Sequence, residues 1–584
     1  MGAITMVRRL PWWVGSLLGA GCAVLGVVLI FRPFDSLAVL VAVVAAGAFL
    51  MGASSVSAAR RSAAGWPSVA AGLVWVAVGV AVLAWPDLTT RGLAVVVGLA
   101  LIAGGLLDVA AGVRGSTDER LASIVGGASS VVFGALALSW PSVTLLVIAV
   151  VFGFRLVMFG LRLAWSSFRD RHGDVPAEED RPKGKVRKFA HFVGTVVALA
   201  VALSLAGVSA KLHEGEPVVD AFYDAPSDVP NEPGVLLRSE EFTRTIPDDA
   251  QAWRILYTTT RADGVPALAS ALVVVPVDRP SGPMPVIALA HGTTGVDRTC
   301  APSVLKDPFA AGAFFALGDV IAHGWALVAT DYVGLGTEGG HPYLVGEPEG
   351  RSVLDSVRAA RQLTGIDLTD KTVVWGHSQG GGAALWTGGL APTYAPDTNV
   401  IGVAALAPAS DLVGLANNLS KVTGGSIFAS YLLRGYANAY DDVDVADYVS
   451  PVARTSFDEV VGRCLAEPSV LLSAVGSVTL GDEVFSKDLA SGPLLDRLTE
   501  NVPTLPIEAP LLLAQGEADS LVVPAVQADY VAARCDAGQP IDYRTYPGLD
   551  HVPLVETGSA LLPDLFEWTQ ARFDGGSFEP TCGG

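Results

Sequence analysis

The chain has 584 residues, of which 51% are hydrophobic, and a mean hydropathy of +0.47, which is too apolar for a purely soluble protein. Residues 1–210 carry 17 Lys and Arg against 10 Asp and Glu, whereas residues 211–584 carry 21 against 48. The net charges of +7 and −27 indicate that the two parts lie in different solvents, the first of them lipid. An acidic domain has little attraction for nucleic acid or anionic lipid, so both are excluded as its partners.

The first part is predicted to be an all-α transmembrane bundle. Its apolar stretches each reach the roughly 20 residues that cross a bilayer. They are residues 10–31, 36–59, 63–86, 92–113, 121–140 and 143–164, and residues 189–210 form a seventh span. The first six form three helical hairpins that turn at Pro33, Pro86 and Pro141, which lie 53 and 55 residues apart. This spacing predicts an internal repeat.

Basic residues in the short loops predict the orientation of the bundle. Arginines at 8 and 9, 60 and 61, and 114 and 120 alternate with nearly uncharged turns at the three prolines. The positive-inside rule then puts the N-terminus and the basic linker 166–188 in the cytoplasm. Seven crossings place the rest of the chain, from about residue 211, outside the cell membrane.

The hairpin repeats of residues 1–165, with Trp at helix starts and Pro at the turns, resemble the HdeD-like family of multi-pass membrane proteins. The resemblance covers residues 8–165 and implies a six-span membrane region. It implies no catalytic residues.

Residues 211–234 are predicted to be a linker. The stretch 213–234 contains four prolines and six carboxylates and few apolar residues, so it is expected to stay extended and solvated. The domain after it, residues 235–584, is long enough to bury its own core.

Strand-like and helical runs alternate along residues 235–584, which predicts an α/β domain with a mostly parallel sheet covered on both faces. The predicted strands are residues 252–260, 268–275, 286–290, 326–329, 372–375, 401–406, 511–514 and 541–546, and the helices are 352–364 and 525–534. Residues 411–502 break the pattern and are predicted to form a cap over the site.

A candidate nucleophile stands at the end of a predicted strand, in Gly376-His377-Ser378-Gln379-Gly380. Gly-x-Ser-x-Gly between a strand and a helix puts the serine in a strained turn with its Oγ exposed above the sheet. The helix that follows would aim its N-terminal amides at a negative substrate oxygen. His377 and Trp375 are expected to serve packing.

The base and its orienting acid follow from the chain order Ser, acid, His. His551 is the one histidine of eight that lies after Ser378. Asp519 lies on the turn after a predicted buried strand, where it can accept from His551 Nδ1–H. Glu517 and Asp550 remain alternatives for the acid.

The oxyanion hole is expected to combine the backbone N–H groups of Gln379 and Thr293, with His291 holding the loop around Thr293.

The histidines and cysteines show no metal-ligand spacing, and no Gly-rich phosphate loop follows a strand, so no metal and no cofactor are expected. Four cysteines lie in the acidic part: Cys300, Cys464, Cys535 and Cys582. An even set in an exported domain indicates two disulfides, and in a cytosolic domain it would indicate reduced buried thiols.

Several short runs together resemble the secretory lipase group of α/β-hydrolases over residues 235–575. They are residues 253–257, His291-Gly292-Thr293-Thr294-Gly295, Cys300-Ala301-Pro302-Ser303, Asp331-Tyr332-x-Gly334-Leu335-Gly336, His341-Pro342-Tyr343, Ser352-Val353-Leu354-Asp355 and the motif around Ser378. The resemblance implies carboxylic-ester hydrolysis under a helical lid by Ser378, Asp519 and His551. It also implies the pairs Cys300–Cys464 and Cys535–Cys582. Members of the group are usually released, whereas this domain follows seven predicted spans.

The leading hypothesis is a membrane-tethered, extracytoplasmic serine esterase or lipase that acts on lipid or other ester substrates through an acyl-enzyme. One alternative is acyl transfer to an envelope alcohol by the same triad. Another is a membrane stress or scaffold protein whose hydrolase-like domain only binds a ligand.

Overall fold

The structure is a computed structural model that describes residues 12–31, 86–114, 117–141, 185–213, 217–309, 316–474 and 484–582, together with single residues and short runs between 45 and 84 and between 147 and 168. The chain divides into two compact units, Met1–Glu214 with Ser450–Phe457, and Gly215–Val449 with Asp458–Gly584.

The described part of the first unit is helical. Its helices are α2 (Trp12–Phe31), α5 (Pro86–Arg114), α6 (Thr117–Ser139) and α8 (Lys185–His213). They coincide with the predicted spans 10–31, 92–113, 121–140 and 189–210, whereas the spans 36–59, 63–86 and 143–164 lie largely outside the described residues. Among the described residues, Arg120–Ser139 and Phe192–Lys211 are long and apolar enough to cross a bilayer by length and composition.

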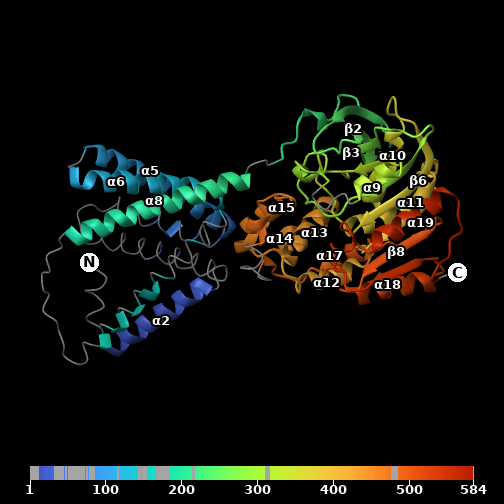
Figure 1. The fold of residues 1–584 in the computed structure, drawn as a ribbon. Coiled ribbons are helices and arrows are strands. Elements are labelled where there is room, and N and C mark those ends of the chain that lie inside the picture. Colours follow the sequence, from blue (N-terminus) through green and yellow to red (C-terminus); the bar gives the residue numbers. More distant parts are fainter. Residues whose placement is uncertain are drawn as a thin grey trace. The chain divides into compact units, whose positions relative to one another are not determined.

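Glycines let α5 and α6 approach until their backbones touch. A Cβ atom on Gly105 would lie 2.5 Å from the carbonyl oxygen of Gly127, and one on Gly127 would lie 2.5 Å from that of Gly105. Helix α8 packs along α6, where Trp140 Nε1–H donates to Ser209 Oγ at 2.8 Å (Figure 1). Apolar side chains on the outer faces are exposed, such as Leu107 at 70%, which suits a lipid environment.

The second unit is built on a nine-stranded sheet. Its strands are β1 (Leu236–Phe242), β2 (Ala250–Thr260), β3 (Pro266–Pro276), β4 (Met284–Ala290), β5 (Ala326–Thr330), β6 (Leu368–His377), β7 (Val400–Leu406), β8 (Leu511–Gly516) and β9 (Asp542–Tyr546). Their order in the sheet is β1-β2-β3-β5-β4-β6-β7-β8-β9. The neighbouring pairs β1–β2, β2–β3 and β3–β5 are antiparallel. The remaining pairs, β5–β4, β4–β6, β6–β7, β7–β8 and β8–β9, are parallel. All eight predicted strands are present, and β1 is an additional edge strand.

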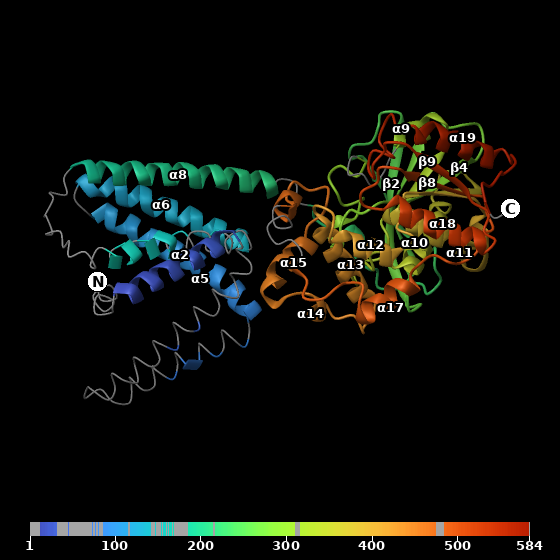
Figure 2. The ribbon, with the colours of Figure 1, turned by 90° about the horizontal axis from the view of Figure 1, so that it is seen from below.

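Successive residues of the central strands face two separate core layers, because side chains alternate across a strand. Val286 and Ala288 of β4 join the layer under α10 (Gly346–Ala360), α11 (Gln379–Tyr394) and α18 (Pro524–Asp536). Ile287 and Leu289 join the layer under α9 (Leu317–Ala322) and α19 (Leu561–Phe573) (Figure 2). Burial on both faces explains the continuous apolar runs of these strands.

The predicted insertion 411–502 follows β7 and is helical in its described parts. Its α-helices are α12 (Leu412–Leu419), α13 (Gly425–Ala439), α14 (Val445–Tyr448), α15 (Arg454–Val461) and α17 (Gly492–Glu500). The chain then returns to the sheet at β8.

The expectation of a solvated linker is wrong for residues 217–234. Phe222 and Tyr223 belong to the core of the second unit and are only 7% and 2% exposed. The Arg254 guanidinium lies 4.3 Å from the centre of the Phe222 ring, and Tyr223 Oη lies 2.8 Å from Ser303 Oγ. The segment is acidic and rich in proline, but its two aromatic residues, Phe222 and Tyr223, pack into the core and hold the segment against the sheet domain.

Candidate active site

The serine turn has the strained geometry that its sequence predicts. Strand β6 ends at His377, Ser378 has φ of 59° and ψ of −120°, and α11 begins at Gln379. A Cβ atom on Gly376 would lie 1.9 Å from the carbonyl oxygen of Gly380, and one on Gly380 would lie 1.9 Å from that of Ala290. Only glycine fits at these two positions, and the close packing holds Ser378 in its unfavourable conformation.

The structure brings together Ser378, His551 and Asp519. His551 Nε2 lies 2.8 Å from Ser378 Oγ, and His551 Nδ1 lies 2.8 Å from Asp519 Oδ2. The other carboxylate oxygen of Asp519 accepts from the backbone N–H groups of Leu521 and Val522, at 2.9 and 2.8 Å. Asp519 therefore favours the tautomer in which Nδ1 carries the proton and Nε2 can accept from the serine hydroxyl.

The two alternative acids, Asp550 and Glu517, have hydrogen-bond partners other than the His551 ring. Asp550 accepts from the N–H groups of Ser520 and His551, which links the acid loop to the histidine loop, and these amides lower the pKa of its carboxyl. Glu517 accepts from the Thr545 hydroxyl at the surface.

The neighbouring rings of His377, Trp375 and His291 are buried and have hydrogen-bond partners within the fold. His377 is buried, and its Nε2 lies 3.0 Å from the carbonyl oxygen of His551. Burial and the neighbouring His551 keep the pKa of His377 well below its ordinary value, so the ring is neutral and donates its N–H to that carbonyl. Trp375 Nε1–H donates to Thr569 Oγ1. The ring nitrogens of His291 lie 2.6 and 3.3 Å from the carbonyl oxygens of Gly292 and Asp331, and burial lowers its pKa to about 4.

Thr293 and Gln379 line one pocket with Ser378. Among the described residues, neither backbone N–H donates to a protein acceptor, so both amides remain available to a substrate oxygen. The other pocket walls come from α12, α13 and loops of the sheet domain and are mostly apolar: Tyr343, Leu344, Ala409, Leu415, Leu419, Phe428, Leu432, Leu521 and Val522. The space left between them is about 20 Å³, room for about one water molecule, so the pocket beside the serine is narrow.

A buried polar group beside this pocket was not predicted from the sequence. Glu349 is 1% exposed, and its Oε1 accepts from Gln379 Nε2–H at 2.7 Å and from the Leu344 N–H at 3.0 Å. Gln379 Nε2 also lies 3.0 Å from His341 Nε2. Burial raises the pKa of Glu349 to about 8 and lowers that of His341 to about 3. In the sequence, an acidic residue in the first turn of a helix is ordinarily interpreted as a solvated side chain near the positive end of the helix dipole. The burial of Glu349 therefore becomes evident only in the folded structure.

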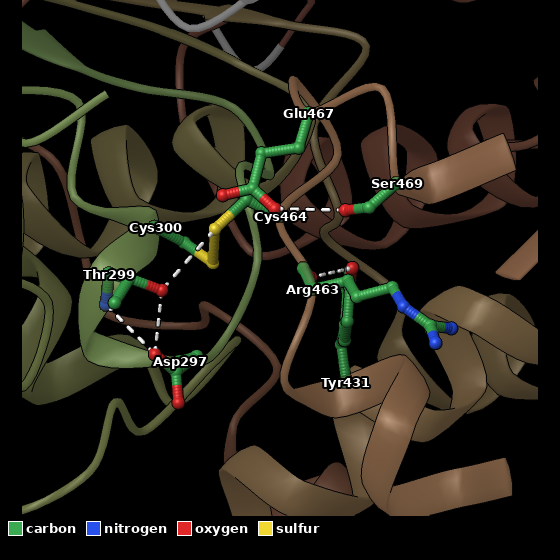
Figure 3. Close-up of a disulfide and its surroundings, with 8 residues drawn as sticks. All are labelled: Asp297, Thr299, Cys300, Tyr431, Arg463, Cys464, Glu467 and Ser469. Carbon is green, nitrogen blue, oxygen red and sulfur yellow. Dashed lines mark hydrogen bonds between the residues drawn. A yellow bond between two sulfur atoms is a disulfide. The ribbon is translucent and has the colours of Figure 1, made fainter. Parts of the chain in front are cut away.

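The structure pairs Cys300 with Cys464 and Cys535 with Cys582, as the family resemblance implies. Figure 3 shows the first disulfide, which joins the loop after β4 to the cap. Beside it, the Leu465 N–H donates to the carbonyl oxygen of Thr294 at 2.8 Å. The loop that carries Thr293 is thus fastened to the cap at Cys464.

Among the described residues, no group of three or more His, Cys, Asp or Glu could hold a metal ion.

The sheet order, the strained serine turn and the helical cap define an α/β-hydrolase fold with a candidate serine nucleophile. Residues 313–581 match the secretory lipase family, and residues 17–78, 70–135 and 125–177 match a short repeat of unknown function, DUF308. The chain therefore carries a secretory lipase domain, preceded by DUF308 repeats of the HdeD-like membrane family.

Individual proteins agree with this assignment. Lipase 5 of Candida albicans is 25% identical over 400 residues, which cover 62% of this chain and 81% of that protein. The secreted triacylglycerol lipase LIP7 of Malassezia globosa is 26% identical over 389 residues, 62% of this chain and 81% of that protein. The X-ray structure of Candida antarctica lipase A in its closed state matches 62% of this chain and 88% of its own, with a TM-score of 0.54 and 21% identity, which shows the fold. Together these relationships support a carboxylic-ester hydrolase.

Proposed function

We propose that the protein is a membrane-tethered, extracytoplasmic serine hydrolase that cleaves carboxylic esters through an acyl-enzyme. The observation that carries the proposal is the hydrogen-bonded series Ser378–His551–Asp519, which opens into an apolar pocket. His551 takes the hydroxyl proton as Ser378 Oγ attacks the ester carbonyl, and Asp519 stabilises the imidazolium. The proton then passes to the departing alcohol, and a water activated by His551 releases the acid.

The oxyanion of each tetrahedral intermediate would lie between the backbone N–H groups of Thr293 and Gln379. Both lack a protein acceptor among the described residues, and Gln379 also stands at the N-terminus of α11, where the helix dipole favours negative charge. Donors fixed in place before the reaction lower the barrier because they need no reorganisation.

The substrate class follows from the pocket and from the charge of the domain. Side chains such as Leu415, Phe428 and Leu432 suit an acyl chain, and the narrow pocket must widen to admit one. The net charge of −27 repels anionic substrates, so the proposed substrates are neutral lipid esters.

Membrane attachment and compartment rest on separate observations. The DUF308 repeats and the apolar helix α8 precede the hydrolase domain, and α8 is proposed to be the last of seven crossings, with its Lys211 end outside. Two disulfides in the hydrolase domain suit an oxidising, extracytoplasmic compartment.

The triad is tested by kinetics and active-site labelling. Ser378→Ala and His551→Ala should each lower kcat for p-nitrophenyl esters by about 10³ or more, and Asp519→Asn by somewhat less. A fluorophosphonate should label the native protein and spare Ser378→Ala. Glu517→Gln, which changes an exposed carboxylate on the same turn as Asp519, is the matched control and should retain activity. More than a tenth of the activity in His551→Ala would contradict the assignment.

A further inference from the structure

The hydroxyl groups of Thr293 and Tyr343 form a pair in the wall of the serine pocket. Thr293 Oγ1 and Tyr343 Oη lie 2.7 Å apart, and both residues line the pocket with Ser378. Among the described residues, neither hydroxyl has another hydrogen-bond partner. The pair holds two hydroxyl protons, and the single hydrogen bond between them uses one, so one proton remains for another acceptor.

The surroundings of Tyr343 decide which proton remains. The residue is 3% exposed, and its ring meets those of His341 and Tyr431 edge-on, with centroids 6.2 Å apart in each case. Its backbone lies against Gly435, where an added Cβ would come within 2.6 Å of the Tyr343 nitrogen. Burial raises the pKa of the phenol far above its ordinary value, so it keeps its proton.

A buried O–H without an acceptor is costly, and in the described surroundings Thr293 Oγ1 is the only acceptor that Tyr343 has. Tyr343 therefore donates, and Thr293 accepts. The proton of the half-buried Thr293 hydroxyl is then free to point into the pocket that contains Ser378.

We infer that the Thr293 hydroxyl is a third oxyanion donor, in addition to the N–H groups of Thr293 and Gln379, and that Tyr343 is the residue that positions it. The inference rests on the proposed ester hydrolysis. The hydroxyl donates a hydrogen bond to the negative oxygen of each tetrahedral intermediate and transfers no proton, so the acylation and deacylation chemistry is unchanged. Tyr343 acts through Thr293 and does not itself contact the substrate.

The test is a double-mutant cycle on the full-length protein. Thr293→Val removes the hydroxyl with little change in shape and should lower kcat for p-nitrophenyl butyrate by about 10², with KM nearly unchanged, as expected for a lost oxyanion donor. Thr293→Ser keeps a hydroxyl and should keep most of kcat. Tyr343→Phe should lower kcat by about tenfold, because the threonine hydroxyl then loses its fixed orientation. In the Thr293→Val background, Tyr343→Phe should have no further effect on kcat.

The outcomes separate this inference from the proposed function. If the native protein neither hydrolyses the ester nor reacts with a fluorophosphonate, the proposed function fails. If the native protein is active and Thr293→Val retains full kcat, or if the two substitutions multiply, the third donor is wrong. The phosphonylation rate at Ser378 should fall in parallel with kcat. Should Thr293→Val fold poorly, Tyr343→Phe decides: unchanged kcat and labelling rate at an unchanged melting temperature would overturn the inference.

Discussion

Glu349 makes the stability of the hydrolase domain depend on pH. Burial raises its pKa to about 8 in the folded protein, from an ordinary value of 4.5. Between these values the folded state retains a proton that the unfolded state has released, so this contribution is complete below pH 4.5 and is lost as the pH rises toward 8.

Glu349→Gln should remove this dependence while its amide oxygen still accepts from Gln379 and Leu344. We expect the apparent Tm of the variant to rise relative to the native protein as the pH goes from 5 to 8, measured by thermal unfolding of the full-length protein in detergent. Glu517→Gln, which changes an exposed carboxylate, should show no such trend. Parallel Tm curves for Glu349→Gln and the native protein would contradict the argument.

The difference between Ser378 and Glu349 shows which site residues a sequence reveals. Ser378 lies in a local pattern whose glycines are required by close backbone contacts, and His551 is the only histidine in the right order along the chain. Glu349 and Tyr343 have no such local pattern. Their importance comes from burial beside Gln379 and Thr293, which only the fold produces.

At the scale of elements, the helical hairpin of α5 and α6 depends on particular glycines. Gly105→Leu should disrupt it, because a Cβ there would collide with the backbone of Gly127. Gly104 is the matched control, since a Cβ there meets no heavy atom of the described residues within 4 Å and Gly104→Leu should be tolerated. The measurement is the yield of monodisperse protein and its apparent Tm in detergent. Equal behaviour of the two variants would show that the backbones do not pack this closely.

The strands were predictable to the extent that they are buried. β4, β6, β7 and β8 are apolar on both faces, and a continuous hydrophobic run predicts each of them. The sequence does not predict β1, because its middle residues, Arg238 to Glu241, are polar and partly exposed at the edge of the sheet. Its strand conformation is fixed by pairing with β2, which no local pattern records.

For the whole molecule, the important segment is the one between α8 and β1. Its composition resembles that of a solvated spacer, yet Phe222 and Tyr223 fill part of the hydrolase core and Asp220 binds Arg254 at 2.9 Å. The hydrolase unit therefore begins before residue 220, and any form of it that lacks these residues loses buried aromatic area.

The last prediction compares two exported forms of the hydrolase domain, one starting at Pro217 and one at Pro233, each behind a cleavable signal. The form starting at Pro217 should be soluble and should hydrolyse short esters about as fast as the full-length protein in detergent. The form starting at Pro233 should melt at a lower temperature, because deleting a buried Phe side chain alone typically costs about 3–5 kcal/mol. Phe222→Ala in the full-length protein is the control and should lower the Tm of the same transition.

The full-length protein should exceed the Pro217 form only on esters that reside in a membrane, because the proposed tethering would raise the local substrate concentration without changing Ser378 or His551. Rates on p-nitrophenyl butyrate and on triacylglycerol in vesicles, measured for both proteins at equal concentrations of labelled Ser378, separate the two effects. If the Pro217 form reacts with a fluorophosphonate yet hydrolyses no short ester until residues 1–216 are restored, those residues take part in catalysis, and tethering is not their role.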